Sequence, residues 1–228
     1  KLSDFRKCRK CFYLDRVRGL KYPGIPAWTL NALTDALLKK EFDECREKQI
    51  PHRLMEAYGL EHVVPFKHEE MDHWRDSTHH GLSTRFKSTN IILHGGVDDI
   101  WWDTRTENVI VVDYKSQAAD KQVTTKNYLV PIYRKGYAEQ IDFYAYLLQE
   151  MGFDVSDVAY FLVCNADRGA EGFYSKLNFS ETLIPYCWHI NWIPSKLEEM
   201  YKTLNSKEIP SSNESCENCA YARQRSMY

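Results

Sequence analysis

The chain has 228 residues, enough for one large domain or for one domain with a small appendage, and enough to bury a hydrophobic core. Its 30 lysine and arginine residues nearly balance its 32 aspartate and glutamate residues, so the formal charge at pH 7 is −2. This balance excludes a uniformly basic nucleic-acid coat protein and an acidic tail protein. Any polyanion that the chain handles must therefore meet a local basic patch.

Membrane and secretory classes are also disfavoured. Hydrophobic residues make up 43% of the chain, but they are scattered, and no run approaches the roughly 20 apolar residues that cross a bilayer. The segment KLSDFRKCRK at the start lacks the apolar stretch of a signal peptide. We therefore expect a cytoplasmic protein with no membrane partner.

Apolar spacing and turn residues predict an order of elements along the chain. After a Pro/Gly turn at residues 22–26, apolar residues recur at helical spacing over residues 28–49. The elements predicted next are a helix at 52–60, a polar histidine-rich loop at 67–80, strands at 82–87, 90–102 and 108–117, a helix at 136–151, strands at 157–165 and 171–179, and a helix at 194–204. This order predicts an α/β fold, in which a mixed central β-sheet is flanked by helices.

The seven cysteines favour metal ligands or free thiols over a disulfide scaffold, because the count is odd and no secretory signal is present. Four of them form one C-x-x-C pair near each end of the chain: Cys8, Cys11, Cys216 and Cys219. Cys164 and Cys187 stand alone in apolar, strand-like runs, and we expect both in the core.

An acidic hairpin is the most informative segment. If the chain turns about residues 105–106, Asp98 lies opposite Asp113, and the alternation of side chains places Lys115 on the same face. Two carboxylates in this relation repel each other unless a cation lies between them. Lys115 supplies one positive charge, and Mg²⁺ or Mn²⁺, which prefer oxygen ligands, would supply the rest. The alternative, a solvated surface cluster, is disfavoured by the strongly apolar strand that Asp113 and Lys115 terminate.

The helix predicted at 136–151 provides a second clue. Tyr137, Ile141, Tyr144 and Leu148 lie on one apolar arc of this helix, and Gln140 falls inside the arc. A buried amide needs hydrogen-bond partners, which a backbone group in the core would provide. The position of Gln140 after the acidic hairpin instead favours a side chain that faces the same site as Asp113.

Three motifs in this order resemble the PD-(D/E)XK nuclease superfamily: G-x-V-D at 95–98, D-Y-K at 113–115 and Y-x-x-Q-x-x-x-Y at 137–144. The likeness is to its RecB-like branch, which includes the RecB and AddB nuclease domains, exonuclease V and CRISPR-associated adaptation nucleases. The motif order spans about residues 5–222. The resemblance implies a restriction-endonuclease-like core and a single nuclease domain over residues 1–228.

The resemblance also implies roles at a divalent-metal site. Asp98 and Asp113 would bind Mg²⁺ or Mn²⁺ with help from the backbone carbonyl of Tyr114, and Lys115 would position or activate the attacking water. Relatives of this branch usually carry a histidine ligand on the early helix, where this chain has Asp35. Asp35, at the edge of the apolar arc of that helix, is either a further metal ligand or an exposed helix charge.

The substrate that the resemblance implies is DNA, single-stranded or with free ends. Gln140 and Tyr144 would orient the site and contact DNA, with Tyr137 as a further DNA-contacting residue. Tyrosines near the motifs, among them Tyr128 and Tyr133, are candidates for base stacking. The implied activity is that of a DNA nuclease, with exonuclease action favoured. Its setting would be repair, recombination or CRISPR-type DNA processing, with protein partners in a DNA-processing complex.

The two C-x-x-C pairs resemble the cysteines of relatives that carry a [4Fe–4S] cluster. Those relatives commonly have one cysteine in front and three behind, whereas this chain has two and two, so the total of four is kept. The resemblance implies a cluster that joins the two ends of the chain, in a lobe made of residues 1–27 and 205–228. Paired C-x-x-C motifs are also typical of a tetrahedral zinc site, and free thiols are the third alternative.

Two other functions compete with the nuclease. The first is a non-catalytic nucleic-acid-binding module that retains a nuclease fold, and the intact set of Asp98, Asp113 and Lys115 disfavours it. The second is thiol redox chemistry, which is disfavoured because neither C-x-x-C pair follows a strand and opens a helix in the thioredoxin manner.

Overall fold

The chain forms two compact units, residues 28–190 and residues 1–27 together with 191–228. The computed structural model describes residues 1–21, 24 and 28–228, so the turn predicted at 22–26 lies almost wholly outside the described residues. Within the described part of the chain, no helix combines the length and the apolar composition that a membrane span requires.

The unit of residues 28–190 is built around a mixed five-stranded sheet in the order β1-β4-β5-β6-β7, and β2 pairs with β3 in a separate hairpin. Its strands are β1 (Val63–Pro65), β2 (Leu82–Arg85), β3 (Ile92–Gly95), β4 (Asp99–Asp103), β5 (Asn108–Gln117), β6 (Val158–Ala166) and β7 (Phe179–Cys187). Its helices are α3 (Thr29–Lys48), α4 (Arg53–Ala57), α5 (Met71–Arg75), the 3-10 helix η1 (Ile132–Arg134) and α6 (Lys135–Glu150). Only β5 and β6 run parallel in the five-stranded sheet, joined by α6, so the predicted α/β class with a mixed sheet is confirmed.

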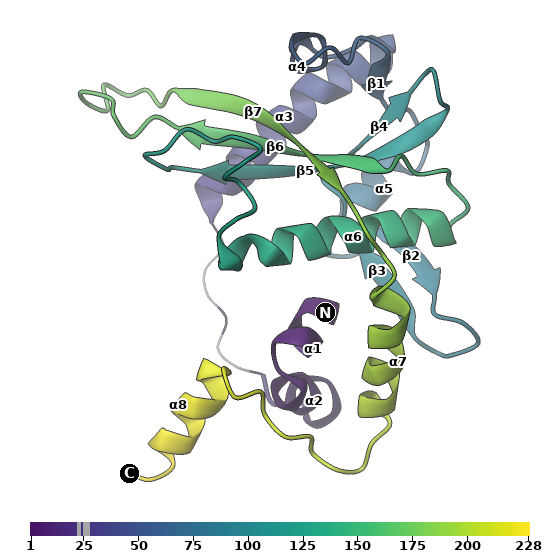
Figure 1. Ribbon diagram of the computed structural model, residues 1–228, viewed down its shortest axis with the longest axis vertical. Helices are drawn as coiled ribbons and strands as arrows, with labels where there is room; N and C mark the ends of the chain where they lie inside the picture. Colours follow the sequence, from purple (N-terminus) through teal and green to yellow (C-terminus); the bar gives the residue numbers. More distant parts are fainter. Residues whose placement is uncertain (22–23, 25–27) are drawn as a thin grey trace. The chain divides into compact units, whose positions relative to one another are not determined.

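The two faces of β5 serve different purposes. Alternate residues Ile110, Val112 and Tyr114 face α3, which lies on the opposite side of the sheet from α6 (Figure 1). This face contributes to the main hydrophobic cluster, made of Leu38, Phe42, Leu54, Met55, Val63, Trp101, Ile110, Val112, Tyr114, Leu162, Cys164 and Leu183. The intervening residues Asp113 and Lys115 point to the side of α6, where the ammonium of Lys115 lies 4.9 Å from the centre of the Tyr137 ring.

A buried ionic network sits at the edge of this hydrophobic cluster. Asp99 is fully buried and accepts hydrogen bonds from Arg46 (2.5 Å), Arg75 (3.0 Å) and the Tyr114 hydroxyl (2.8 Å). Arg75 also forms an ion pair with Asp43 on α3. Because every charge has a partner, the network tolerates burial and ties α3, α5, β4 and β5 together.

The apolar arc of α3 is only partly buried. The helix spans the predicted range, but Leu30, Leu33 and Leu37 in its first half are exposed, and burial begins at Leu38 and continues at Phe42. Periodicity identifies the apolar face of a helix, whereas the length of helix that the sheet covers depends on tertiary contacts.

The single strand predicted at 90–102 is wrong, because β3 and β4 belong to different sheets. The chain leaves the β2–β3 hairpin at Gly95 and Gly96. A side chain at Gly96 would lie 2.4 Å from the backbone of Ser77, so this crossing requires glycine. The continuous apolar pattern therefore conceals a change of sheet.

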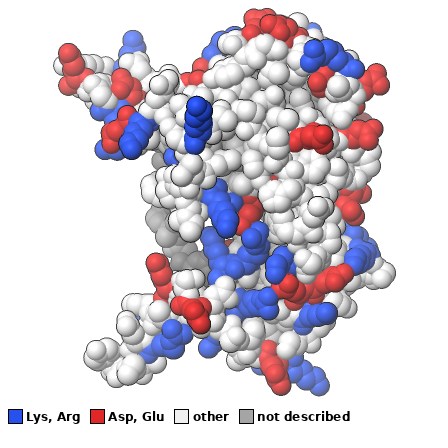
Figure 2. All heavy atoms as spheres, viewed as in Figure 1, with Lys and Arg blue, Asp and Glu red and all other residues white. Residues whose placement is uncertain are grey.

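The strand predicted at 171–179 is also wrong, since β7 occupies Phe179–Cys187. Tyr174 and Ser175 adopt positive φ angles, which interrupt extended structure in the connection between β6 and β7. This connection protrudes from the sheet (Figure 1) and carries both acidic and basic side chains (Figure 2). As a consequence Cys187 lies at a strand end and is exposed, contrary to expectation, while Cys164 is buried as predicted.

The described residues of the second unit form the helices α1 (Leu2–Lys7), α2 (Arg9–Arg18), α7 (Ile193–Leu204) and α8 (Glu217–Arg225). Only α7 was expected from the spacing of apolar residues. The Tyr13 hydroxyl donates to the carbonyl of Ser206 at 3.0 Å, and the Asn213 amide donates to the carbonyl of Lys7 at 2.8 Å, so residues from both ends of the chain form one folded unit. This unit also includes residues 191–204, which precede the lobe predicted from the sequence.

Asp99→Ala should destabilise the protein by about 3–5 kcal/mol, because it leaves the buried guanidinium groups of Arg46 and Arg75 without their shared carboxylate. Urea unfolding followed by tryptophan fluorescence measures this loss. The matched control is Asp157→Ala at an exposed position, which should change stability by less than about 0.5 kcal/mol. Equal stability of the two variants would contradict the structural role of Asp99.

Candidate active site and candidate metal centre

The β4–β5 hairpin brings two carboxylates together on the α6 side of the sheet. The antiparallel ladder pairs Asp99 with Val112, and its continuation places Asp98 opposite Asp113, which confirms the predicted register. The backbone N–H of Tyr114 donates to Oδ2 of Asp98 at 2.8 Å and fixes the orientation of this side chain.

Asp113 is fully buried, and Lys115 forms an ion pair with it. Apart from the Lys115 ammonium at Oδ2, the carboxylate oxygens of Asp113 accept no hydrogen bond from the described residues. Buried carboxylate oxygens are normally satisfied by donors. Asp113 therefore has the capacity to bind a further cationic or donor group.

The protonation of the site follows from burial and from the two neighbouring negative charges. Burial, with the added repulsion of Asp113, raises the pKa of Asp98 to about 7, and burial also raises the pKa of Asp113. Burial alone would lower the pKa of Lys115, but the charges of Asp113 and Asp98 outweigh it and raise that pKa above its ordinary value. Lys115 is therefore protonated at neutral pH, and the pair of carboxylates lacks one positive charge.

Helix α6 covers this site with Tyr137, Gln140 and Tyr144. The Gln140 amide donates to the Tyr144 hydroxyl at 2.7 Å, so Gln140 is bonded to a side chain rather than to a core backbone group. Tyr144 is buried, and its ring packs so closely on Gly95 that a side chain there would come within 2.8 Å of the ring. The glycine of the G-x-V-D motif thus makes room for the tyrosine of the helix motif.

Asp35 lies near the same site. It is half-buried on α3, forms an ion pair with Lys39 at 2.9 Å, and contributes repulsion that raises the pKa values of Asp98 and Asp113. The carboxylates of Asp35, Asp98 and Asp113 do not gather as closely as 4.8 Å from one another. The carbonyl oxygen of Tyr114 lies 3.5 Å from the ammonium of Lys115.

The donor set of this site fits a hard divalent cation. Carboxylate and carbonyl oxygens are the ligands that Mg²⁺ and Mn²⁺ prefer, and Lys115 is the donor that pairs with Asp113 among the described residues. A divalent ion at this position would offset the repulsion that raises the pKa of Asp98.

The four cysteines of the C-x-x-C pairs form a second candidate metal site, within the unit built from both chain ends. All four sulfur atoms lie within 4.8 Å of one another, which confirms that the cysteines come together. The nearest pairs are Cys11–Cys219 at 3.5 Å, Cys11–Cys216 at 3.6 Å and Cys8–Cys219 at 3.8 Å. This arrangement can bind a metal ion.

Each C-x-x-C pair lies at the start of a helix. Cys8 is the N-cap of α2 and Cys216 is the N-cap of α8, so the positive ends of both helices point toward the sulfur atoms. Burial would raise the pKa of Cys8, but hydrogen bonds from the backbone of Cys11 and Asn213 and from neighbouring thiols lower it to about 7. The structure therefore favours a thiolate at Cys8, which is the form that binds metals.

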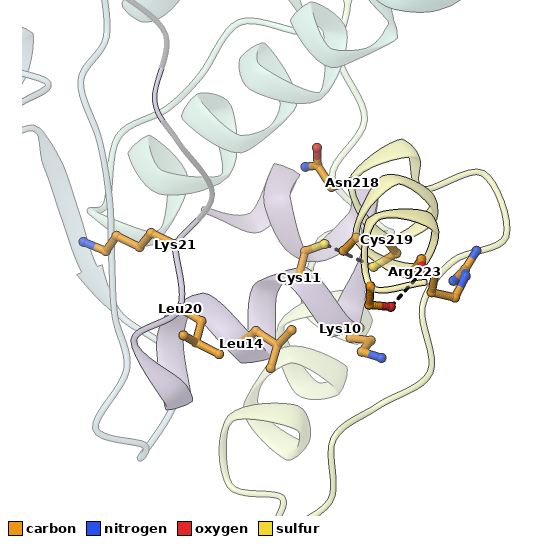
Figure 3. A pocket seen from close by; sticks show the side chains of 10 residues that line it. Lys10, Cys11, Leu14, Leu20, Lys21, Asn218, Cys219 and Arg223 are labelled. Carbon is orange, nitrogen blue, oxygen red and sulfur yellow. Dashed lines mark hydrogen bonds between the residues drawn. The ribbon is translucent and has the colours of Figure 1, made fainter. Parts of the chain in front are cut away.

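A pocket of about 370 Å³ opens beside this centre (Figure 3). Cys11 and Cys219 form part of its wall, and the charged side chains that line it are Lys10, Lys21 and Arg223. The charged side chains in the wall of this pocket are therefore all basic.

The chain belongs to the PD-(D/E)XK nuclease superfamily, whose family model matches residues 1–224. Members of this superfamily are in general hydrolytic nucleases that use divalent metals, and the fold implies a nucleic-acid substrate. Comparisons with curated proteins and with solved structures gave no match.

Sequence reasoning missed Asp99 and Arg134. Asp99 follows Asp98 directly, and strand alternation alone would have placed it on the opposite face. Its partners Arg46 and Arg75 come from distant helices, which no spacing rule connects to it. Arg134 precedes α6 and stacks on Tyr128 at 4.5 Å, a contact that depends on the path of a long loop.

Cys219→Ser should destabilise the protein by several kcal/mol, because metal binding at a site assembled from both chain ends contributes to folding stability. Cys11 and Cys216 are 205 residues apart, so their joint ligation closes a long loop. Thermal unfolding with and without a chelator measures the effect. Chelation should lower the wild-type melting temperature and leave the variant almost unchanged.

The matched control is Cys164→Ser, which removes a buried thiol outside the centre and should cost only a local packing energy. This variant should keep the response to the chelator. A metal-free wild-type protein that melts at the same temperature with and without chelator would contradict the metal centre.

Proposed function

We propose that the chain is a divalent-metal-dependent DNA nuclease of the RecB-like branch that hydrolyses phosphodiester bonds in single-stranded DNA or at DNA ends. The observation that carries this proposal is the set of buried Asp113 with half-buried Asp98 and Lys115, in which Lys115 is the one cation paired with Asp113 among the described residues. A structural ion pair would need one carboxylate, whereas two carboxylates with one ammonium leave one negative charge for a proton or a further cation to balance. In this proposal both units belong to one nuclease domain, with the cysteine centre in the smaller unit.

The proposed metal ligands are Asp98, Asp113 and the carbonyl of Tyr114, and Asp35, whose charge acts on both aspartates, is a further candidate. Bound Mg²⁺ or Mn²⁺ would supply Lewis acidity at the phosphate and lower the pKa of a water molecule. The chain itself holds Asp98 in place through the N–H of Tyr114 and excludes bulk water from Asp113 by burial.

Lys115 acts in this proposal as a fixed cation. Because its pKa is raised, its ammonium stays protonated and donates hydrogen bonds, so it is suited to orient the attacking water and to stabilise charge on the phosphate. It is not suited to accept the proton of that water. The ring of Tyr137 at 4.9 Å and the carboxylate of Asp113 restrict the positions of the ammonium.

Gln140, Tyr144 and Tyr137 are proposed to orient the site and to contact DNA. Tyr144 is buried and bonded to Gln140, which supports a role through the position of Gln140. Tyr137 is half-buried beside Lys115, which supports a direct contact with substrate. Exonuclease action at DNA ends, in repair, recombination or CRISPR-type processing with protein partners, is the setting that the motif likeness favours.

The identity of the metal at the cysteine centre has two candidates. A Zn–S distance of about 2.3 Å places the sulfurs of a tetrahedral site about 3.8 Å apart, close to the separations of 3.5–3.8 Å in this centre. Four irons would hold the sulfurs farther apart, so the spacing supports a single ion such as Zn²⁺, while the motif likeness supports a [4Fe–4S] cluster. Elemental analysis of anaerobically purified protein separates about one zinc from about four irons with sulfide.

Lys115→Ala should lower Mn²⁺-dependent cleavage of end-labelled single-stranded DNA by about 10²- to 10⁴-fold, because it removes a positioned charge from the reacting centre. Gel analysis of cleavage rates measures the effect, and circular dichroism confirms that the variant is folded.

The matched control is Lys67→Ala, which removes an exposed lysine that pairs with Glu47 and should leave the rate unchanged. Equal rates for wild type and Lys115→Ala would contradict the site. Tight DNA binding by the wild type without any cleavage in Mn²⁺ would instead identify a non-catalytic binding module.

A further inference from the structure

A small pocket adjoins Lys115 on the side away from Asp98. Its volume is about 190 Å³, and it is lined by the end of β5 and the chain that follows, by Tyr128, and by Tyr133, Arg134 and Tyr137 at the start of α6. The pocket and the candidate active site therefore share Lys115 as a common wall.

Arg134 is held rigidly in this pocket. Its guanidinium donates to the carbonyl of Tyr128 at 2.7 Å and to Oε1 of Gln117 at 2.8 Å. It also lies 4.5 Å from the centre of the Tyr128 ring and 5.4 Å from that of Tyr133. The result is a flat cation fixed between two aromatic rings, which holds the exposed ring of Tyr133 in a position where a nucleobase can stack on it.

The C-terminal end of β5 is held in place by hydrogen bonds as well. The Gln117 amide donates to Oδ1 of Asn165 at 3.1 Å, and Asn165 also bonds both backbone groups of Ala119. These bonds hold the polar wall of the pocket in place, so binding there would require little ordering of the protein.

The opposite wall is open and apolar. Tyr133 has 68% of its surface exposed, and its neighbours Val130 and Ile132 are more exposed still. Of these three exposed side chains Tyr133 lines the pocket, and an exposed aromatic ring at a pocket is a favourable place for a ligand to cover.

The size of the pocket restricts its ligand. Pockets that bury a drug-sized molecule start at about 300 Å³, so a pocket of about 190 Å³ has room for one planar group but not for a base pair. Polar groups along one wall and aromatic rings along another match the edge and the face of a single base.

We propose that this pocket binds one unpaired nucleobase next to the phosphate held at Lys115, so that the substrate is a nucleic acid with an unpaired segment at the cut. The proposal rests on the proposed nuclease function and specifies its substrate class. Tyr133 would stack on the base through the exposed face of its ring, and Arg134 would hold that ring in place from behind.

Binding of a DNA duplex with a single-stranded overhang, without added divalent cations, tests the proposal apart from catalysis. The overhang carries 2-aminopurine, and stacking quenches its fluorescence. Tyr133→Ala should weaken binding roughly five- to hundredfold, the range for loss of one base–aromatic stack, and should remove the quenching. Tyr133→Phe should restore both.

Two controls make the result specific. Tyr58→Ala changes an exposed tyrosine beyond α4 and should leave binding and quenching unchanged. An overhang with an abasic site in place of the stacked base should bind wild type and Tyr133→Ala equally. Unchanged binding of the 2-aminopurine overhang by Tyr133→Ala, or an equal loss on the abasic overhang, would overturn the base pocket. Failure of the wild type to cleave this DNA with Mn²⁺ would overturn the nuclease activity separately.

Discussion

The repulsion between Asp98 and Asp113 is the constraint on which the rest of the site depends. Apolar residues on both faces of β5 fix the register of the hairpin, and a slip of one residue would turn Asp113 into the hydrophobic cluster beneath α3. The register therefore holds two carboxylates together in the interior, where the charge of Lys115 balances only part of their negative charge. In the proposed function a divalent cation would complete the charge balance, and this would connect the fold to phosphodiester hydrolysis.

The opposite face of the hairpin supports this arrangement. Asp99 follows Asp98 and is held by two arginines, and the Tyr114 hydroxyl reaches the same carboxylate while its backbone N–H binds Asp98. One pair of adjacent aspartates thus has two environments. Asp99 is saturated with donors and anchors the sheet, whereas Asp98 is short of positive charge and is free to bind a cation.

Local patterns predicted much of the fold and the site, and long-range contacts account for the rest. Strand β5 and the position of Asp98 opposite Asp113 follow from alternation and turn residues, both of which are local. The pairing of four cysteines from both chain ends was indicated by equal C-x-x-C spacing. In contrast, the break at Gly96 depends on the approach of Ser77, and the partners of Asp99 depend on how α3 and α5 pack. No spacing rule describes such contacts.

Calorimetric titration of Mn²⁺ into the protein at pH 7, in two buffers of different ionisation enthalpy, tests the carboxylate pair most directly. Because the pKa values of Asp98 and Asp113 are both raised, protons should leave the pair as Mn²⁺ binds. Asp98→Asn should bind Mn²⁺ much more weakly and release fewer protons. Thiolates are poor ligands for Mn²⁺, so the cysteine centre should not contribute. Equal Mn²⁺ affinity in wild type and Asp98→Asn would contradict the account.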